Sequence, residues 1–339
     1  MARRKNFFPK KVLLQMIGAP FLIVLCVMLY MFGIHSTVRQ TVVFDIVSGD
    51  TVSGVAGRLL ENNLIDSEQI FKMAVRLNGG KIQSGQYDIP VGASSWRIAD
   101  MFADGQVAST TIVIPEGLTI KQIKQLLLQS SVLTGAVECK AGNTAPVCSL
   151  KDGQIFPDTY TVARGTNRLA VLDLARKKMQ TIEEVLRKSA RKLPRPLKNW
   201  NDVLTLASIV QKETPRVEEM PIVASVYLNR LNKGMRLQAD PTVVYALTDG
   251  LGDMQGAPLL RGHLKIESPY NTYRNSGLPP APIANVGQAA IRAVLMPADT
   301  NYLFFVADGK GGHRFSKDYE EHKKNHNDWR KIKKLKNKN

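Results

Sequence analysis

The feature that most constrains this chain is a long run without a single charged side chain, residues 12–34. At about 1.5 Å per residue, a helix of that length reaches roughly 34 Å, which exceeds the bilayer's hydrocarbon core of about 30 Å. Basic side chains gather immediately before the run, at Arg3, Arg4, Lys5, Lys10 and Lys11. Because the positive flank of a membrane helix stays in the cytoplasm, we expect a basic cytoplasmic stub at residues 1–11 and export of the chain after residue 34.

A cleaved signal peptide is the alternative interpretation of this segment. Its apolar region would be shorter, and a small-x-small cleavage site would follow it. The chain instead has the bulky residues Tyr30, Met31 and Phe32 near the end of the run. We therefore expect a retained single-pass anchor in the cytoplasmic (inner) membrane, with the remainder of the chain on the periplasmic or extracytoplasmic side.

The exported part is long enough for two domains with hydrophobic cores. The chain has 339 residues, of which 44% are hydrophobic, and this composition excludes a disordered tether. The formal net charge is +17, and most of the excess lies in the stub 1–11 and in a basic tail at residues 323–339. On an exported protein, such a tail favours anionic lipid, a wall polymer or plain solvent over nucleic acid.

Two cysteines lie close together in the exported part and bracket a loop. Cys139 and Cys148 enclose a stretch with Gly, Asn and Pro, so we expect a disulfide there, whereas Cys26 falls in the membrane helix. The histidines are scattered among loop and tail segments, and the sequence lacks the Cys/His spacing of a zinc site. We therefore predict neither a metal nor another cofactor.

A short pattern recurs three times after the anchor, beginning at Ile46, Ile89 and Ile114. Each time a Gly, then a Ser or Thr, then a Val or Ile follow at the same spacing, and the apolar pattern continues at Leu59, Phe102 and Leu127. This predicts a strand, a Gly turn, a Ser/Thr N-cap and an amphipathic helix. The first two units resemble the small LysM-type glycan-binding fold, which makes residues 43–110 a LysM-like subdomain. A generic strand-to-helix turn explains the same residues, so glycan binding there stays open.

One acidic residue falls on the apolar face of a predicted helix, residues 202–213. Val203, Leu206 and Val210 recur at helical spacing, and Glu213 lies three positions after Val210 on the same face. Burial would raise the pKa of this carboxyl group by about one to three units, as a general acid near neutral pH requires. Alternatively, Glu213 tips into solvent at the helix end or pairs with an arginine.

Six segments, in order along the chain, together resemble the YceG-like endolytic murein transglycosylases: 206–214, 223–231, 234–245, 268–273, 277–280 and 305–313. The membrane helix and the LysM-like region ahead of them match the layout of that family. The resemblance implies an α+β protein whose larger, mixed α+β catalytic domain carries the catalytic Glu at the end of a helix. The implied division is a stub at 1–11, a membrane helix at 12–34, a linker at 35–42, the LysM-like subdomain at 43–110, the catalytic domain at 111–322 and the basic tail at 323–339.

What the resemblance implies is a lyase, namely a peptidoglycan lytic transglycosylase. Such an enzyme cleaves the β-1,4 bond between N-acetylmuramic acid and N-acetylglucosamine within nascent glycan strands, leaves a 1,6-anhydromuramic end and terminates elongation. In the family's Glu-Lys-Glu-Thr motif the second Glu is catalytic and falls on Glu213, whereas the first Glu is Gln211 in this chain. Any supporting role of that first carboxylate is therefore missing. The family also implies partnership with a peptidoglycan synthase.

A single carboxyl group suffices for this reaction, although ordinary glycosidases use two. Glu213 would give a proton to the glycosidic oxygen and then take one from the sugar's own 6-hydroxyl, which is held in place by the bound ring. Eight residues are candidates for holding the sugar: Gln238, Asp240, Ser268, Tyr270, Asn271, Tyr273, Asp158 and Tyr160. A structural role is the alternative for each, since Asn and Asp beside Pro commonly bind their own backbone.

Two other functions stay open at this point. Asp240 and Glu267 are compatible with a two-carboxylate muramidase, which would leave reducing muramic ends. A non-catalytic, membrane-anchored scaffold that binds peptidoglycan is the second alternative, whereas the predicted anchor argues against a soluble nucleic-acid binder. The anchor would also restrict activity to glycan near the outer surface of the cytoplasmic membrane, where new strands emerge.

Overall fold

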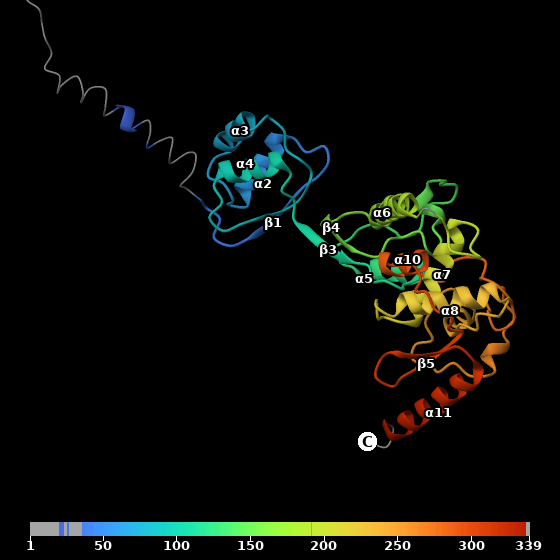
Figure 1. The fold of residues 1–339 in the computed structure, drawn as a ribbon. Helices are drawn as coiled ribbons and strands as arrows, with labels where there is room; N and C mark the ends of the chain where they lie inside the picture. The colour runs from blue at the N-terminus through green and yellow to red at the C-terminus, as the bar shows by residue number, and fades with distance from the viewer. Residues whose placement is uncertain (1–19, 24–25, 27–35, 191, 337–339) are drawn as a thin grey trace, which may run out of the picture. The chain divides into compact units, whose positions relative to one another are not determined.

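The computed structural model describes residues 20–23, 26, 36–190 and 192–336. It is a mixed α+β structure that is mostly helical, and its described strands form small two-stranded sheets. Two compact units divide the chain (Figure 1): unit 1 takes Met1–Thr110 and Val162–Gly165, and unit 2 takes Thr111–Thr161 and Thr166–Asn339. The predicted membrane helix, residues 12–34, lies largely outside the described residues, and within the described part no helix is long and apolar enough to span a membrane.

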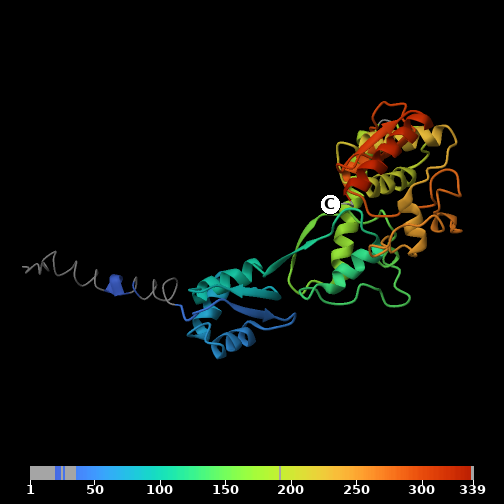
Figure 2. The ribbon, with the colours of Figure 1, turned by 90° about the horizontal axis from the view of Figure 1, so that it is seen from below.

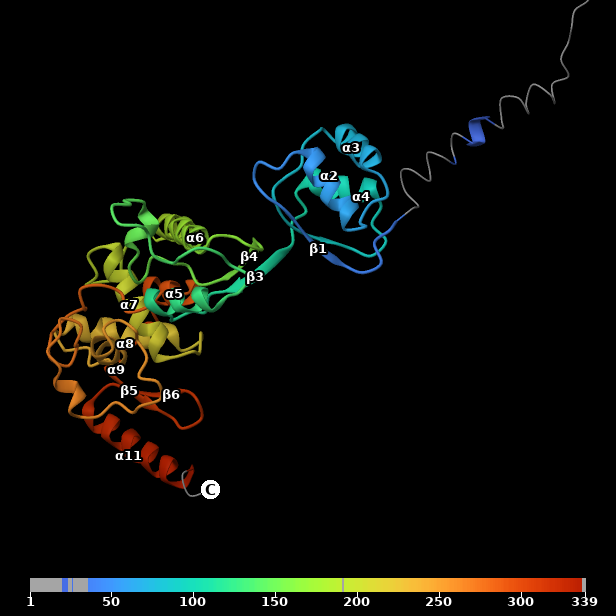
Figure 3. The ribbon, with the colours of Figure 1, turned by 180° about the vertical axis from the view of Figure 1, so that it is seen from behind.

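Between residues 36 and 104, unit 1 contains an antiparallel strand pair and three helices. Its elements are β1 (Val42–Ile46), α2 (Val52–Glu61), α3 (Glu68–Leu77), β2 (Gly85–Ile89) and α4 (Ser95–Asp104). β1 pairs with β2 so that Val42 lies opposite Ile89, and the helices gather beside the pair (Figures 1 and 3). Rings of Phe44, Phe71 and Tyr87 contact Phe102 at the centre of the core.

The recurring sequence pattern forms a strand, a turn and a helix in all three places. The predicted N-caps each accept a hydrogen bond from the backbone N–H three residues on, at Thr51, Ser94 and Thr119. The glycines before them have φ angles of 97°, 79° and 78°, in the left-handed region that favours glycine. The third helix, α5 (Ile120–Gln129), belongs to unit 2.

The rest of the chain continues with a strand pair, β3 (Ser109–Val113) and β4 (Thr159–Ala163), and with the elements of unit 2. These are η2 (Pro146–Ser149), α6 (Arg168–Ser189), α7 (Trp200–Glu213), α8 (Met220–Asn232), α9 (Asp240–Leu247), η3 (His263–Lys265), α10 (Gln288–Leu295), β5 (Phe304–Ala307), β6 (His313–Ser316) and α11 (Tyr319–Lys336). Cys139 and Cys148, the pair predicted from the sequence, are joined by a disulfide.

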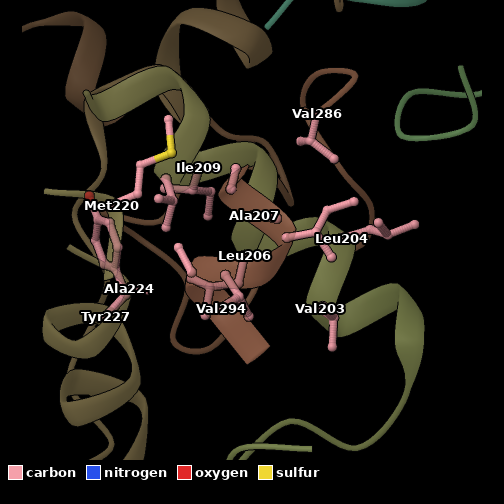
Figure 4. Close-up of a cluster of buried hydrophobic side chains, with 14 of the residues drawn as sticks. Val203, Leu204, Leu206, Ala207, Ile209, Met220, Ala224, Tyr227, Val286 and Val294 are labelled. Atoms are coloured by element: carbon pink, nitrogen blue, oxygen red, sulfur yellow. The ribbon is translucent and has the colours of Figure 1, made fainter. Parts of the chain in front are cut away.

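Helix α7 is the centre of the core of unit 2. All residues from Val203 to Val210 are buried, so the helix is enclosed on every side. Figure 4 shows Leu206 and Ile209 of α7 among side chains of α8 and α10, including Ala224 and Val294. The helix begins two residues earlier than predicted from the sequence, because Asn199 and Asp202 form a capping box there.

The segment predicted as a basic tail forms most of α11. This helix, red in Figures 1 to 3, packs against β5 and β6. The Asn325 Nδ2 atom donates to Ser316 Oγ at 3.1 Å, and Arg314 pairs with Asp328 at 3.5 Å. The many polar and basic residues of this segment concealed the packing, in which the rings of Tyr319 and His322 also contact Phe304 of β5.

Candidate active site

The C-terminal end of α7 carries Glu213 to the edge of the core of unit 2. The capping box fixes the start of the helix, the core packs around its length, and Thr214 ends it with its backbone N–H on the Val210 carbonyl. Because interiors are close-packed, a helix enclosed in this way holds its last side chain in a defined position. Glu213 is partly buried there, as its place on the apolar face of the helix suggests.

Tyr227 of α8 holds the carboxyl group of Glu213. Its phenol O–H donates to Glu213 Oε1 at 2.7 Å. The tyrosine is itself fixed, since it is 1% exposed and meets the Phe305 ring edge-on, with 5.8 Å between ring centroids. Such a donor orients the carboxyl group and favours its ionised form.

Burial raises the pKa of Glu213 to about 7. The hydrogen bond from Tyr227 acts in the opposite direction, the negative charge of Asp240 adds to the rise, and His313 and Arg230 lower the pKa to a smaller extent. Near neutral pH the group is therefore close to half protonated. A carboxyl group in this state can give a proton and take one back within a single reaction cycle.

A cavity of about 390 Å³ lies in front of Glu213. Three of the predicted sugar-binding residues line it together with Glu213, namely Gln238, Asp240 and Tyr273. The other lining side chains, apart from Leu237, come from α8, β5 and α11 and are aromatic or basic in large part. Concave sites with a few convergent polar groups and a perturbed pKa are where ligand chemistry is expected.

Arg230 of α8 ties two walls of this cavity together. Its Nε donates to the carbonyl of Leu303 at 2.6 Å, and its Nη1 donates to the carbonyl of Leu237 at 2.7 Å. Gln238, the next residue, has a φ of 49°, a left-handed conformation that costs a non-glycine residue about 1–2 kcal/mol. Strain of this kind persists where the surroundings impose it, and it clusters at ligand sites.

Asp240 and Tyr273 form a hydrogen-bonded pair at the cavity. The Tyr273 O–H donates to Asp240 Oδ1 at 2.6 Å. Burial and the negative charge of Asp240 raise the pKa of Tyr273, so the phenol keeps its proton at neutral pH. Asp240 is exposed at the first residue of α9, which leaves its second oxygen available to a sugar hydroxyl.

A second acid lies close to the end of α7 and binds a histidine. Glu219 accepts from the backbone N–H of His313 at 3.1 Å through one oxygen, and its other oxygen lies 2.8 Å from His313 Nδ1. The Thr214 hydroxyl also donates to Glu219, at 3.3 Å. Within the described residues, no group of three or more His, Cys, Asp or Glu side chains is arranged to hold a metal ion.

Ser268 and Tyr270, also predicted to bind sugar, line a different cavity of about 440 Å³. The Tyr270 ring lies 4.8 Å from that of Tyr245, whose O–H donates to Asp152 at 2.7 Å. Ser268 Oγ accepts from the backbone N–H of Tyr270. The structure therefore does not bring these two predicted residues together with Glu213.

The remaining predicted residues have partners within the protein. Asn271 is buried, and its Nδ2 donates to the carbonyls of Leu264 and Ile266, so it shapes the loop that carries Tyr273. Asp158 forms an ion pair with Lys178. The Tyr160 O–H donates to the Phe156 carbonyl at 2.5 Å, and Asp158 and Tyr160 do not line the cavity at Glu213.

Gln211 and Glu267 also have identified roles. Gln211 Oε1 accepts from the backbone N–H of Gly287 at 3.1 Å, a bond that a carboxylate oxygen would equally accept. Glu267 pairs with Arg274 at 3.1 Å and is not part of the Glu213 cavity.

Sequence reasoning did not single out Tyr227, Arg230 and Glu219 as site residues. Tyr227 and Arg230 lie three positions apart within segment 223–231, in which Ser225 and Asn229 are also polar. Polar groups at positions that a helix buries were the available signal. Glu219 gave no such signal, because its partner His313 is 94 residues away.

Comparison with known proteins gives a consistent result. Residues 44–328 of this chain match the sequence model of the YceG-like family. An endolytic murein transglycosylase of Bacillus subtilis (strain 168) is 30% identical over 309 residues, which cover 84% of each chain. A protein of the same name from Streptococcus pneumoniae serotype 2 is 24% identical over 330 residues, covering 86% of this chain and 59% of that protein.

One solved structure, a putative yceG-like protein from Listeria monocytogenes, is 27% identical and aligns with a TM-score of 0.49. The alignment covers 84% of this chain and 99% of that one. Since the family match extends over most of the described chain, including the end of α7, the cavity and β6, this chain belongs to the YceG-like family.

Proposed function

We propose that this protein is an endolytic lytic transglycosylase that cuts the β-1,4 bond between N-acetylmuramic acid and N-acetylglucosamine within peptidoglycan strands. The observation that carries the proposal is Glu213, a single carboxyl group with a pKa of about 7 at the wall of a polar cavity. Relatives that bear the name endolytic murein transglycosylase support the choice of substrate and reaction.

In the first step, protonated Glu213 gives its proton to the glycosidic oxygen. The bond between that oxygen and the anomeric carbon of the muramic acid breaks, and the N-acetylglucosamine leaves as an alcohol. Glu213 becomes a carboxylate, and the hydrogen bond from Tyr227 stabilises this new charge. The protein thus stabilises the Glu213 carboxylate that forms as the glycosidic bond breaks.

In the second step, the 6-hydroxyl of the same muramic acid closes on its anomeric carbon. The Glu213 carboxylate takes the proton of that hydroxyl as the new carbon–oxygen bond forms, which restores the acid. No water enters the reaction, because nucleophile and leaving group both belong to the strand. Orientation of the ring in the cavity replaces the second carboxylate of an ordinary glycosidase.

A two-carboxylate muramidase is the competing function, because Asp240 lines the same cavity as Glu213. One Asp240 oxygen accepts from Tyr273, which suits a group that positions substrate. Glu267, the other acid that the sequence offered, is paired with Arg274. Analysis of the ends released from purified murein separates the two functions, since hydrolysis gives reducing muramic ends and transglycosylation gives 1,6-anhydro ends.

We also propose that residues 12–34 anchor the protein in the cytoplasmic membrane, with the chain after residue 34 outside. The charge-free run and its basic flank support this, and the Cys139–Cys148 disulfide suits an oxidising compartment. Protease treatment of spheroplasts tests it, because the chain after residue 34 should be digested without lysis. Full protection until lysis would place that part of the chain in the cytoplasm and contradict the proposal.

A further inference from the structure

Rings on one face of α11 form a continuous row. The side chains at positions 319, 322, 326 and 329 recur every third or fourth residue, so they share a face of the helix. Successive ring centroids lie 6.4 Å, 6.3 Å and 5.6 Å apart, along Tyr319, His322, His326 and Trp329. The Lys333 ammonium follows, 5.1 Å from the Trp329 ring. We call this set of four rings the aromatic row.

The aromatic row begins inside the candidate active site. Tyr319, His322 and His326 are lining residues of the Glu213 cavity, whereas Trp329 lies one turn further along α11. Ligands can reach the row from solvent, since Tyr319 is 63% exposed and the other three rings keep part of their surface exposed. It therefore continues the cavity wall along the helix, in the direction away from Glu213.

The chemistry of the row suits sugars. Ring faces stack on the apolar faces of pyranose rings, and imidazoles exchange hydrogen bonds with hydroxyl and acetamido groups. The His322 ring stacks on the Phe304 ring with 5.2 Å between centroids, and its Nδ1 is buried without a hydrogen-bond partner among the described residues. Burial lowers the pKa of His322, which keeps the ring neutral and able to accept a hydrogen bond.

Basic side chains border the aromatic row on its solvent side. At 3.6 residues per turn, Lys323 and Arg330 lie next to the row on the side away from β5 and β6, and both are exposed. Lys324, equally exposed, lies on the opposite side of the helix from the row. Murein strands carry peptide stems with carboxylates, so a strand stacked on the row would bring anionic groups beside Lys323 and Arg330.

We propose that the aromatic row of α11 is a binding track for the glycan strand, continuous with the catalytic cavity, and that Lys323 and Arg330 contact its acidic peptide stems. This inference rests on the proposed function for its choice of ligand. It assigns a role in substrate binding to residues 323–330. A strand that occupies both the cavity and the row is held at sites beyond the scissile bond, which favours cutting inside strands over trimming their ends.

Strand-binding measurements on the full-length protein in detergent test the proposal. The Glu213→Gln background prevents cutting, and the probes are a four-sugar murein fragment and long uncrosslinked murein strands. Trp329→Ala should lower the ratio of long-strand to short-fragment affinity about tenfold. Trp329→Phe should restore most of that ratio, because a ring face remains, and Asn327→Ala, off the row on the same helix, is the matched control.

The contacts of Lys323 and Arg330 are tested by comparing the affinity for strands that carry peptide stems with the affinity for strands without them. Lys323→Ala and Arg330→Ala should weaken binding of stem-bearing strands only, and Lys324→Ala should weaken neither. Circular dichroism of each variant shows that α11 still forms. An unchanged affinity ratio in a folded Trp329→Ala variant would overturn the track.

Two further outcomes separate the claims. If the protein with Glu213 intact fails to cut murein, the proposed function fails, yet the affinity ratio still decides the track. If reconstitution into phosphatidylglycerol bilayers shifts the tryptophan fluorescence of the wild type but not of Trp329→Phe, and strands cause no such shift, the row contacts membrane and the proposal is wrong.

Discussion

The interiors of the two units differ in kind. In the described part of unit 1, the buried side chains are apolar apart from the N-cap Ser94 and the hydroxyl of Tyr87. Unit 2 buries many more polar side chains, including Arg230, Asn271 and Thr272, each of which has hydrogen-bond partners. Burying a polar group without a partner costs several kcal/mol, so an interior of this kind requires a matched network.

The difference shows where the chemistry belongs. The largely apolar core of unit 1 stabilises its fold, and the Tyr87 phenol buried there donates to the Gln83 carbonyl at 2.8 Å. In unit 2 the network of Tyr227 and Arg230 holds a carboxyl group at the end of a buried helix, with a raised pKa and a defined orientation. The following predictions test this contrast between a structural interior and a reactive one.

The largest effect is expected for Glu213→Gln in unit 2. The amide keeps the size of the side chain but cannot give a proton, so the rate of murein cleavage should fall about 10²–10⁴-fold. Release of soluble fragments from purified murein measures it. Murein pull-down should be retained, and cleavage at the wild-type rate by this variant would contradict the assignment.

In unit 1, Phe102→Ala should act on stability alone. It removes a ring that contacts Phe44, Phe71 and Tyr87 in a closed core, which costs about 3–5 kcal/mol. Chemical denaturation measures the loss for unit 1. Leu60→Ala, on the exposed side of α2, is the control and should change stability by about 0.5 kcal/mol or less. Equal effects of the two would show that the ring cluster is not the core.

The ionisation of Glu213 should make the stability of the protein depend on pH. Its pKa rises from an ordinary 4.5 to about 7 on folding, so between these values the folded state keeps a proton that the unfolded chain releases. Stability from this group is complete below pH 4.5 and is lost as the pH rises to 7. The Glu213→Gln variant lacks this loss, so its stability relative to wild type should increase by about 3 kcal/mol between pH 4.5 and pH 8.

Denaturation of both proteins at the two pH values measures this difference, in which the other titrating groups cancel. A stability difference that is the same at both pH values would mean that Glu213 ionises as it does in the unfolded chain.

A smaller effect is expected for Tyr227→Phe. The ring and its packing on Phe305 remain, but the carboxylate formed in the first step loses its donor, so the rate should fall about tenfold. The same bond lowers the pKa of Glu213, so its removal should move the alkaline limb of the pH–rate profile to higher pH. A rate loss without that shift would indicate that Tyr227 only supports the fold.

Local rules made part of this structure predictable. The Gly turns and the N-caps at Thr51, Ser94 and Thr119 depend on neighbours within a few residues, and so does the place of Glu213 on the apolar face of α7. The Cys139–Cys148 pair closes a short loop of the same local kind.

The rest depends on contacts between distant parts of the chain. Arg230 bonds a carbonyl 73 residues away, and Glu219 meets His313 across 94 residues. Ser268, Tyr270 and Tyr273 lie within six residues of sequence, yet the first two line another cavity than Tyr273 does. The packing of α11 was hidden for the same reason, because a basic and polar helix gives no hydrophobic signal of its partner strands.

The central claim, that one carboxyl group drives an intramolecular ring closure, is tested most directly by the chemistry of the new ends. Intact glycan strands are incubated with the full-length protein in water enriched in heavy oxygen, and the fragments are examined by mass spectrometry. The account predicts that the wild type produces 1,6-anhydromuramic ends without heavy oxygen. The Glu213→Gln variant should produce no such ends. Reducing muramic ends that carry heavy oxygen would contradict it and indicate hydrolysis.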